Sequence, residues 1–544
     1  MRHPWLRVLF LLLPLALYAD DGARYLIFCR DDFIPAVSRL AEWKHATGVS
    51  TRVVPLSQLG VDTAAVHQYI INAWNSWPTR PEYVLIVADA AYLRSKIYGS
   101  GPDRYYSDAY YGDVTGDFVC ELAVGRFPAR TLDQCQVMVE KTMAYLKPPV
   151  PDDSLWMRRL TTIVREDYDA DDTIYWNNVR QAARLAGEAG FVACDSLSLS
   201  RGDDAGDVLA SVDSGTGIVL YRGRGTNNWY SPFAVEPAYT ANGTRLPIIL
   251  SMTCETMALD PYDSMVGEAW VRATGYPGPN GAVAFVGNTH SDVSVAAIRG
   301  AVTRGFFAGL FTEDEYRLGK TVLRAKLQIY WEYPQAVADY RGFNLYGDPE
   351  LPIWTATPKQ LVVEHPDSIP PGPRDLEVTV SHDGAPVAGA VVCATMDTTV
   401  CSVATTGLSG QATLHVEPAD TGRLRLVVSG HNLLPCDTVI RVANQSGLQS
   451  GHARAARPAS LVARPSVFSS HTTLLLPGPV EPGSHVAIHD AGGRLVRELS
   501  CPSAGNVVWD GNDASGQAVR PGVYVCILAS GGSVRSGARV TRLP

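Results

Sequence analysis

Residues 25–55 read YLIFCRDDFIPAVSRLAEWKHATGVSTRVVP, and this stretch holds a strand, a helix and a second strand in succession. Residues 25–28 and 52–55 are short strand-like runs, whereas residues 34–47 carry apolar side chains at helical spacing. Two strands separated by a helix are typical of a parallel pair joined by a crossover. The stretch therefore predicts an α/β fold built on a parallel sheet.

The same alternation continues to about residue 357. A helix is expected at 63–74 and a strand at 83–88. Later strands are expected at 160–164, 217–221, 246–252 and 281–287, and later helices at 175–189 and 293–310. Such alternation predicts a mostly parallel sheet with helices on both faces, in which functional side chains gather at the carboxyl ends of the strands.

The character of the sequence changes after Trp354. Helical periodicity ends, and short β-rich runs separated by Gly, Pro and Asp take over at 376–380, 390–394, 412–416 and 424–428. This pattern predicts that two all-β sandwich modules, joined by a polar linker, follow the α/β domain, with Trp509 in the core of the last one. The expected boundaries are 20–357, 358–443, 444–464 and 465–544.

Residues 1–19 have the layout of a secretory signal peptide, because basic residues precede an apolar run at 8–17 and the small residue Ala19 follows it. The apolar run is too short to cross a bilayer as a helix. Leu17 is large for a position this close to a cleavage point, so an uncleaved N-terminal anchor is the alternative. The expectation is an exported protein.

Charge and cysteine content narrow the expected partners. The formal net charge is -9 at pH 7 and there is no basic stripe, which argues against nucleic acid as a partner. The 10 cysteines of an exported chain allow disulfides. Cys393 with Cys401, and Cys501 with Cys526, have spacings that fit a bridge, but spacing alone does not determine connectivity.

Two strand ends in the α/β domain carry residues suited to chemistry. The strand at 217–221 ends in a glycine-rich turn, and the strand at 246–252 is followed by Cys254. A thiol at the carboxyl end of a parallel strand is partly exposed, and the backbone N–H groups of such turns can hold an oxyanion. By itself, Cys254 is also compatible with a buried, inert cysteine.

Several segments, in order along the α/β domain, resemble the gingipain family of bacterial cysteine peptidases. They are SDAYYGD at 107–113, ELAVGRF at 121–127, YRGRG at 221–225, the strand through Cys254, EAWVRA at 268–273, GAVAFVG at 281–287 and NLYGDPELPIW at 344–354. The resemblance covers the whole α/β domain. It implies a caspase/gingipain-like fold, a protein or peptide as substrate or ligand, and no required cofactor.

By this resemblance, Cys254 is the nucleophile, Glu166 is the acidic residue that orients a histidine, and Gly225 contributes an oxyanion-hole N–H together with Cys254. The histidine position itself is occupied by Arg224. Arginine stays protonated, so it can neither take the thiol proton nor give one to the leaving amine. We expect an ion pair between Glu166 and Arg224, and His290 is the candidate for a substitute base.

The resemblance implies further site residues. Asp172, in an acidic loop, and Asn288 and Thr289, in the loop that leads to His290, are expected to line the substrate pocket. Asp113 and Asp117, in the turn DVTGD, are expected to bind calcium, an ion that prefers carboxylate oxygens. For both acidic segments, a solvated polar loop is the alternative.

The C-terminal modules carry resemblances of their own. Residues 359–442 resemble the immunoglobulin-like domain that follows the gingipain catalytic domain, with a generic β-sandwich spacer as the alternative. Residues 467–543, which include VVWDGNDASGQAVRPGVY at 507–524, resemble hook-capping-like and type IX secretion sorting modules. The second resemblance implies outer-membrane secretion machinery as a partner and a secreted or cell-surface location in a bacterium.

Two functional hypotheses follow from these features. In the first, the chain is an exported cysteine endopeptidase that acts through Cys254, with weak or absent turnover because Arg224 replaces the histidine. In the second, it is a catalytically inactive pseudo-peptidase that serves as a cell-surface binding or adhesion protein.

Overall fold

The computed structural model describes most of the chain. The described residues are 22–148, 154–260, 264–275, 278–292, 295–397, 400–444, 461–476, 480, 483–490, 494–501, 506–530 and 533–543. The expected signal peptide and most of the expected linker lie outside them. The chain divides into two compact units, 1–361 with 367–446 and 362–366 with 447–544, and the expected domain boundaries stay predictions.

A 10-stranded sheet forms the centre of the first unit. Its strands, in spatial order, are β2 (Thr51–Pro55), β1 (Tyr25–Cys29), β3 (Tyr83–Val87), β6 (Ala123–Phe127), β14 (Phe343–Tyr346), β13 (Ala284–Asn288), β12 (Ile248–Met252), β9 (Ile218–Arg222), β7 (Arg159–Val164) and β8 (Ala193–Ser198). Only the β13–β14 pair is antiparallel. The predicted α/β fold with a mostly parallel sheet is confirmed.

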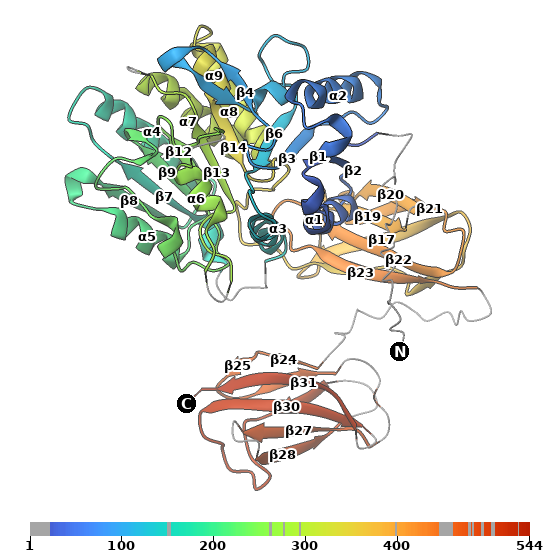
Figure 1. The fold of residues 1–544 in the computed structure, drawn as a ribbon. Coiled ribbons are helices and arrows are strands. Elements are labelled where there is room, and N and C mark those ends of the chain that lie inside the picture. Colours follow the sequence, from blue (N-terminus) through green and yellow to red (C-terminus); the bar gives the residue numbers. More distant parts are fainter. Residues whose placement is uncertain are drawn as a thin grey trace, which may run out of the picture. The chain divides into compact units, whose positions relative to one another are not determined.

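Helices lie on both faces of this sheet (Figure 1). They are α1 (Ile34–Ala46), α2 (Thr63–Ser76), α3 (Leu132–Leu146), α4 (Asp171–Glu188), α5 (Ala205–Ser214), α6 (Val266–Arg272), α7 (Ala296–Phe311), α8 (Leu318–Glu332) and α9 (Val337–Gly342). Strand β1 shows why both faces are covered, since Tyr25 and Ile27 join the apolar cluster of α1 while Leu26 and Phe28 join that of α2. Successive side chains of a strand point to opposite faces, so α1 and α2 pack on opposite sides.

Short elements connect the larger ones. Two small antiparallel pairs are β4 (Lys96–Tyr98) with β5 (Tyr105–Ser107), and β10 (Gly225–Thr226) with β11 (Asn228–Trp229). The 3-10 turns are η1 (Asp31–Phe33), η2 (Leu56–Leu59), η3 (Gly101–Asp103), η4 (Ala109–Tyr111), η5 (Leu155–Arg158), η6 (Leu199–Arg201) and η7 (Pro237–Tyr239). The β10–β11 turn follows β9 directly and therefore shapes the carboxyl edge of the sheet.

The rest of the first unit is β-rich. One sheet contains β17 (Arg374–His382), β18 (Ala385–Pro386) and β21 (Gln411–Val416), whereas β15 (Val362–Glu364) belongs to the second unit. A second sheet contains β16 (Ser368–Ile369), β23 (Cys436–Val442), β22 (Gly422–Ser429), β19 (Val391–Met396) and β20 (Val400–Thr405). The all-β character agrees with the sequence, and the immunoglobulin-like assignment stays a prediction.

The second unit is also β-rich. Its sheets contain β24 (Val462–Arg464), β26 (Thr472–Leu475) and β29 (Asn506–Trp509), and β25 (Val467–Phe468), β31 (Ser533–Arg542), β30 (Gly522–Ser530), β27 (His485–Asp490) and β28 (Leu495–Ser500). Trp509 is fully buried between the rings of Phe468 and Tyr524, with centroids 5.4 and 5.1 Å away, which confirms its expected core position. The likeness to a sorting module stays a prediction.

The two suggested disulfides are not formed, since no disulfide joins the cysteines of the described residues. Cys393 lies opposite Val403 rather than Cys401 in the β19–β20 register. Cys526 lies in β30, and β27 separates β30 from β28, the strand that Cys501 follows. Register therefore separates Cys501 from Cys526, whereas the side chains of Cys393 and Cys401 stay in hydrogen-bond contact, which together with burial raises the pKa of Cys393.

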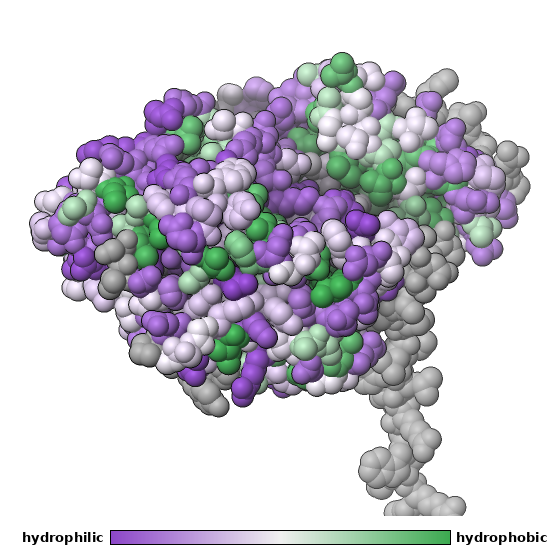
Figure 2. All heavy atoms as spheres, turned by 90° about the horizontal axis from the view of Figure 1, so that it is seen from above, coloured by the Kyte–Doolittle hydropathy of each residue, from purple (hydrophilic) through white to green (hydrophobic). Residues whose placement is uncertain are grey.

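Figure 2 views the molecule from the side on which α9 and β4 lie in Figure 1. Hydrophilic residues cover most of the visible face, and hydrophobic residues appear in separate groups. Within the described part of the chain, no helix has the length and apolar character needed to cross a membrane.

A buried charge cluster anchors the end of the α/β region. Lys44, on α1 and 1% exposed, contacts Asp348 at 2.5 Å and also contacts Glu350. Arg317 contacts the other oxygen of Glu350 at 2.6 Å. Burial alone would raise the pKa of Glu350, but Arg317 and Lys44 outweigh it and hold this pKa below its ordinary value. Each charge in the cluster is therefore compensated by its neighbours.

We expect Lys44→Met to lower the free energy of unfolding of the first unit by about 3–5 kcal/mol at pH 7, because Asp348 and Glu350 lose a buried partner. A carboxylate whose folded pKa is depressed stabilises the fold above its unfolded pKa, about 4.3, and this stability is lost as the pH falls through the folded value. The loss of unfolding free energy caused by Lys44→Met should therefore become smaller in acid. Urea unfolding across this pH range measures it, and the exposed Lys359→Met, which should change little, is the control.

Candidate active site

The candidate site lies at the carboxyl edge of the central sheet. Strands β9, β12 and β13 are neighbours and run parallel, so their carboxyl ends lie side by side. Arg224, Cys254 and His290 each follow one of these ends by two residues. The sheet therefore brings the three residues that the sequence singled out to one edge, as expected for a parallel sheet.

Cys254 is held by an arginine that the sequence analysis did not identify. Nη1 of Arg299 donates to the sulfur at 2.6 Å, and the sulfur lies 3.8 Å from the backbone oxygen of Asp292, to which the thiol donates. Arg299 lies in the first turns of α7 and is 4% exposed. No histidine in the described part of the chain donates to or accepts from Cys254. The sulfur is therefore paired with a buried cation instead of a histidine.

Arg224, which follows β9, forms a double ion pair. Its Nε lies 3.1 Å from Asp167 and its Nη2 lies 2.7 Å from Asp169. The carboxylate of Asp167 is 2% exposed, contacts Arg165 and accepts from the Tyr175 hydroxyl at 3.2 Å. Burial raises the pKa of Asp167 although Arg224 and Arg165 oppose it, and the charge of Asp167 raises the pKa of Arg224.

The expected ion pair between Glu166 and Arg224 is not formed. Glu166 is buried and accepts from the hydroxyl of Ser200 at 2.6 Å and from its backbone N–H at 3.4 Å. Asp167, the next residue, lies 3.1 Å from Nε of Arg224. The chain therefore turns Asp167, and not Glu166, toward Arg224. The sequence places Asp167 next to Glu166, but it does not show which of the two side chains faces Arg224.

Asp172 shapes the acidic loop that holds Arg224. Its carboxylate accepts from the backbone N–H groups of Asp167 at 2.7 Å and Tyr168 at 2.9 Å, at the start of α4. These bonds fix the backbone that carries Asp167 and Asp169. The expected role of Asp172 in lining a substrate pocket stays a prediction.

Asn288 and Thr289 are buried in the loop after β13. Asn288 accepts from the backbone N–H of His290 at 2.7 Å and donates to Asp339 at 3.3 Å. The Thr289 hydroxyl donates to the backbone oxygens of Tyr106 and Gly342. Both side chains therefore fix the loop that presents His290, and their expected part in the pocket stays a prediction.

Gly225 packs tightly beside Thr253, the residue before Cys254. A Cβ on Gly225 would lie 2.9 Å from the backbone oxygen of Asn228 and 3.0 Å from a methyl carbon of Thr253. The close approach requires glycine and places the Gly225 backbone against the end of β12. An oxyanion hole built from the N–H groups of Gly225 and Cys254 stays a prediction, and the packing supports it.

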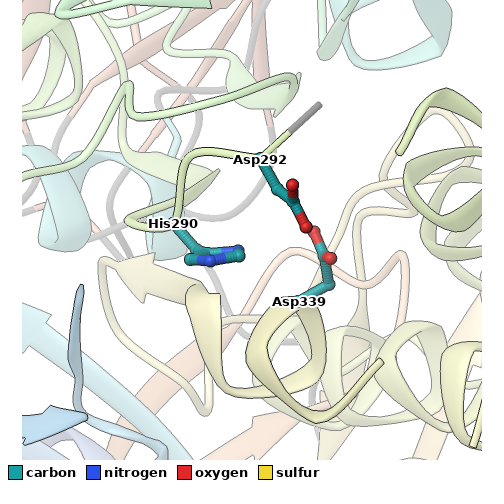
Figure 3. Close-up of side chains that lie close together, drawn as sticks. All are labelled: His290, Asp292 and Asp339. Atoms are coloured by element: carbon teal, nitrogen blue, oxygen red, sulfur yellow. The ribbon is translucent and has the colours of Figure 1, made fainter. Parts of the chain in front are cut away.

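His290 and two aspartates form a compact group near Cys254. A ring nitrogen of His290 and one carboxylate oxygen each of Asp292 and Asp339 lie within 4.8 Å of one another (Figure 3). Nε of Arg299 lies 3.6 Å from Asp339. Burial raises the pKa of Asp339, although the charges of Arg299 and His290 oppose the rise. This is the one set of three potential metal ligands found among the described residues.

The two expected calcium ligands accept hydrogen bonds from the backbone of their own turn. Asp113 accepts from the backbone N–H groups of Gly116 at 2.7 Å and Phe118 at 3.0 Å, while Asp117 accepts from Val119 at 3.0 Å. Both carboxylates therefore stabilise their own turn. Calcium at this turn stays a prediction.

Comparison with known proteins agrees with this geometry. The profile of peptidase family C25 matches residues 18–354. Gingipain R2 of Porphyromonas gingivalis is 20% identical over 384 residues, which are 67% of this chain and 50% of the relative. Lys-gingipain HG66 of Porphyromonas gingivalis is 20% identical over 480 residues, 79% of this chain and 26% of the relative. The chain thus spans half or less of these relatives.

A solved structure shows the same fold. The crystal structure of the Arg-specific cysteine proteinase gingipain R superposes with a TM-score of 0.70 at 18% identity, and the match covers 78% of this chain and 98% of that one. A likeness at this identity establishes the fold, and the profile match covers more than half of the chain. Together with a cysteine at the expected strand end, these matches show that the chain belongs to peptidase family C25.

Proposed function

We propose that this chain is an exported cysteine-type endopeptidase of family C25 that binds peptides and attacks their carbonyl groups with Cys254, but turns over peptide bonds slowly. The observation that carries the proposal is the 2.6 Å contact from Arg299 to the Cys254 sulfur. A charge-assisted donor of this kind stabilises a negatively charged sulfur, the nucleophilic form of cysteine. The site thus has a supported nucleophile without a histidine relay.

The missing step is proton transfer to the leaving group. In attack on a peptide bond, the Cys254 sulfur bonds to the carbonyl carbon, the carbonyl oxygen becomes an oxyanion, and the C–N bond breaks only when the nitrogen gains a proton. Arg224 cannot supply that proton, and its two aspartate partners hold it as a cation. An activated ester differs because its phenolate leaves without a proton.

This difference gives the test of the function. With a peptidyl nitrophenyl ester, we expect a burst of one nitrophenolate per chain as the Cys254 thioester forms, followed by slow turnover. The corresponding Arg, Lys and neutral fluorogenic amides should show little release. A peptidyl thiol-directed probe should label Cys254, and labelling should be absent in Cys254→Ala and unchanged in Cys401→Ser, whose thiol is exposed.

Two results would decide against this function. A burst that persists in Cys254→Ala would place the nucleophile elsewhere. Absence of both burst and labelling in the intact protein would favour the second candidate function, a pseudo-peptidase that serves as a cell-surface binding or adhesion protein. The double ion pair of Arg224 is the observation that supports this alternative, since it fills the place of a proton relay.

We propose further that the chain is secreted or displayed at a bacterial cell surface through outer-membrane secretion machinery. The signal-peptide pattern of residues 1–19 and the sorting-module pattern of residues 467–543 support this location. A protein or peptide is the expected substrate or ligand.

A further inference from the structure

The loop after β13 and the short helix α9 bring three potential metal ligands together. His290 and Asp292 come from the loop and Asp339 comes from α9. Figure 3 shows the imidazole ring pointing toward the two carboxylates, which point toward each other. The ligand atoms lie within 4.8 Å of one another, in a group that combines one nitrogen and two oxygen donors.

His290 gives independent evidence for a bound ligand at this group, because one of its ring nitrogens has no hydrogen-bond partner. The residue is 7% exposed, and its Nδ1 is buried without a hydrogen-bond partner. Its ring packs edge-on against Tyr105, with centroids 4.9 Å apart, and its backbone N–H is held by Asn288. The ring is therefore fixed in place while a buried nitrogen stays unsatisfied. Such a nitrogen costs free energy unless a ligand pairs with it.

The charges of the group also call for a cation. Asp292 and Asp339 approach each other closely, and two carboxylates in one site repel unless a positive charge lies between them. Arg299 compensates the charge of Asp339 only in part, because its Nε lies 3.6 Å from Asp339 while its Nη1 is engaged with Cys254. A divalent ion at the centre of the group would neutralise both carboxylates.

We propose that His290, Asp292 and Asp339 bind a first-row divalent cation of the Zn²⁺ class beside Cys254. Imidazole nitrogen with carboxylate oxygen is a donor set that suits Zn²⁺, whereas Ca²⁺ and Mg²⁺ prefer oxygen alone. Tetrahedral ligation at about 2.0–2.2 Å separates ligand atoms by roughly 3.4 Å, so side-chain adjustments on the order of 1 Å complete the site. Three protein ligands leave a fourth position open.

The site is tied to the nucleophile but does not depend on its chemistry. The backbone oxygen of Asp292 accepts from the Cys254 thiol at 3.8 Å, and Arg299 joins Cys254 to Asp339. A bound ion would draw Asp339 toward itself. Arg299 would then contact Cys254 without also pairing with Asp339. Metal binding requires no turnover, so it can be measured whether or not the proposed peptidase activity exists.

Metal binding is measured on the purified full chain after chelator treatment, by titration calorimetry with Zn²⁺ alone. We expect one Zn²⁺ per chain in the intact protein and in Cys254→Ala. His290→Ala and Asp339→Asn should each weaken binding by at least about 100-fold, since loss of outer-shell partners already costs 10–100-fold. His415→Ala removes a surface histidine that contacts one carboxylate at 3.1 Å, and this matched control should bind normally.

A spectroscopic measurement on the unaltered chain covers the case in which a variant fails to fold. Co²⁺ bound to one nitrogen and two oxygens in a low-coordinate site gives visible d–d absorption without a sulfur-to-metal charge-transfer band. The same spectrum is expected in Cys254→Ala. The proposal is wrong if binding persists unchanged in folded His290→Ala and Asp339→Asn, if it disappears in Cys254→Ala, or if the intact chain binds neither ion.

Discussion

Replacing Arg224 with histidine is expected to raise the rate of peptide-bond hydrolysis by about 10²–10⁴-fold, the usual contribution of a positioned general acid–base group. An imidazole at position 224 would start from the turn after β9, beside the end of β12 that carries Cys254. Asp167, which is buried and now pairs with Arg224 at 3.1 Å, is placed to orient the new ring. The leaving amine would then have a proton donor.

Release from the fluorogenic amides measures this gain, and two further variants test its cause. Arg224→Gln removes the same ion pairs without adding a base, so it should stay as slow as the parent chain. Asp167→Asn introduced into Arg224→His should reverse much of the gain, because the imidazole loses its carboxylate partner. Equal rates for the histidine and glutamine variants would show that a histidine at position 224 is not sufficient for proton transfer to the leaving amine.

Replacing Arg299 with methionine is expected to slow alkylation of Cys254 at neutral pH by roughly 10–100-fold. This range corresponds to the roughly 1.5–3 kcal/mol that a hydrogen bond to a charged group contributes. Arg299 donates to the sulfur at 2.6 Å and is almost completely buried, so water cannot replace it easily. Methionine keeps most of the side-chain volume while it removes the cation and the donors.

Iodoacetamide labelling, followed by mass spectrometry of the peptide that contains Cys254, measures the effect. Arg304→Met is the matched control, because Arg304 also lies on α7 but pairs with Glu332 and does not contact the thiol. Arg299→Lys keeps a charge without the planar fork of donors, so its alkylation rate should lie between those of Arg299→Met and Arg304→Met. If Cys254 is alkylated at the same rate in Arg299→Met and in the parent chain, Arg299 does not activate the thiol.

Part of the site follows from the order of residues along the chain. Cys254 and Arg224 each lie two residues after the end of an apolar strand, and the carboxyl ends of parallel strands meet at one edge of the sheet. Their proximity was therefore predictable once the alternation of strands and helices was recognised. The choice between Glu166 and Asp167 was not, because it depends on which way each side chain turns at the end of β7.

The sequence by itself determined the α/β alternation, the β-rich character that follows it and the strand end that carries Cys254, because hydrophobic periodicity is a local property. Only the tertiary structure decided the partners of these residues. Arg299 contacts Cys254 across 45 positions, and Asp169 contacts Arg224 across 55. Such contacts depend on the packing of α7 and α4 against the sheet and on side-chain direction, and neither is encoded in local spacing.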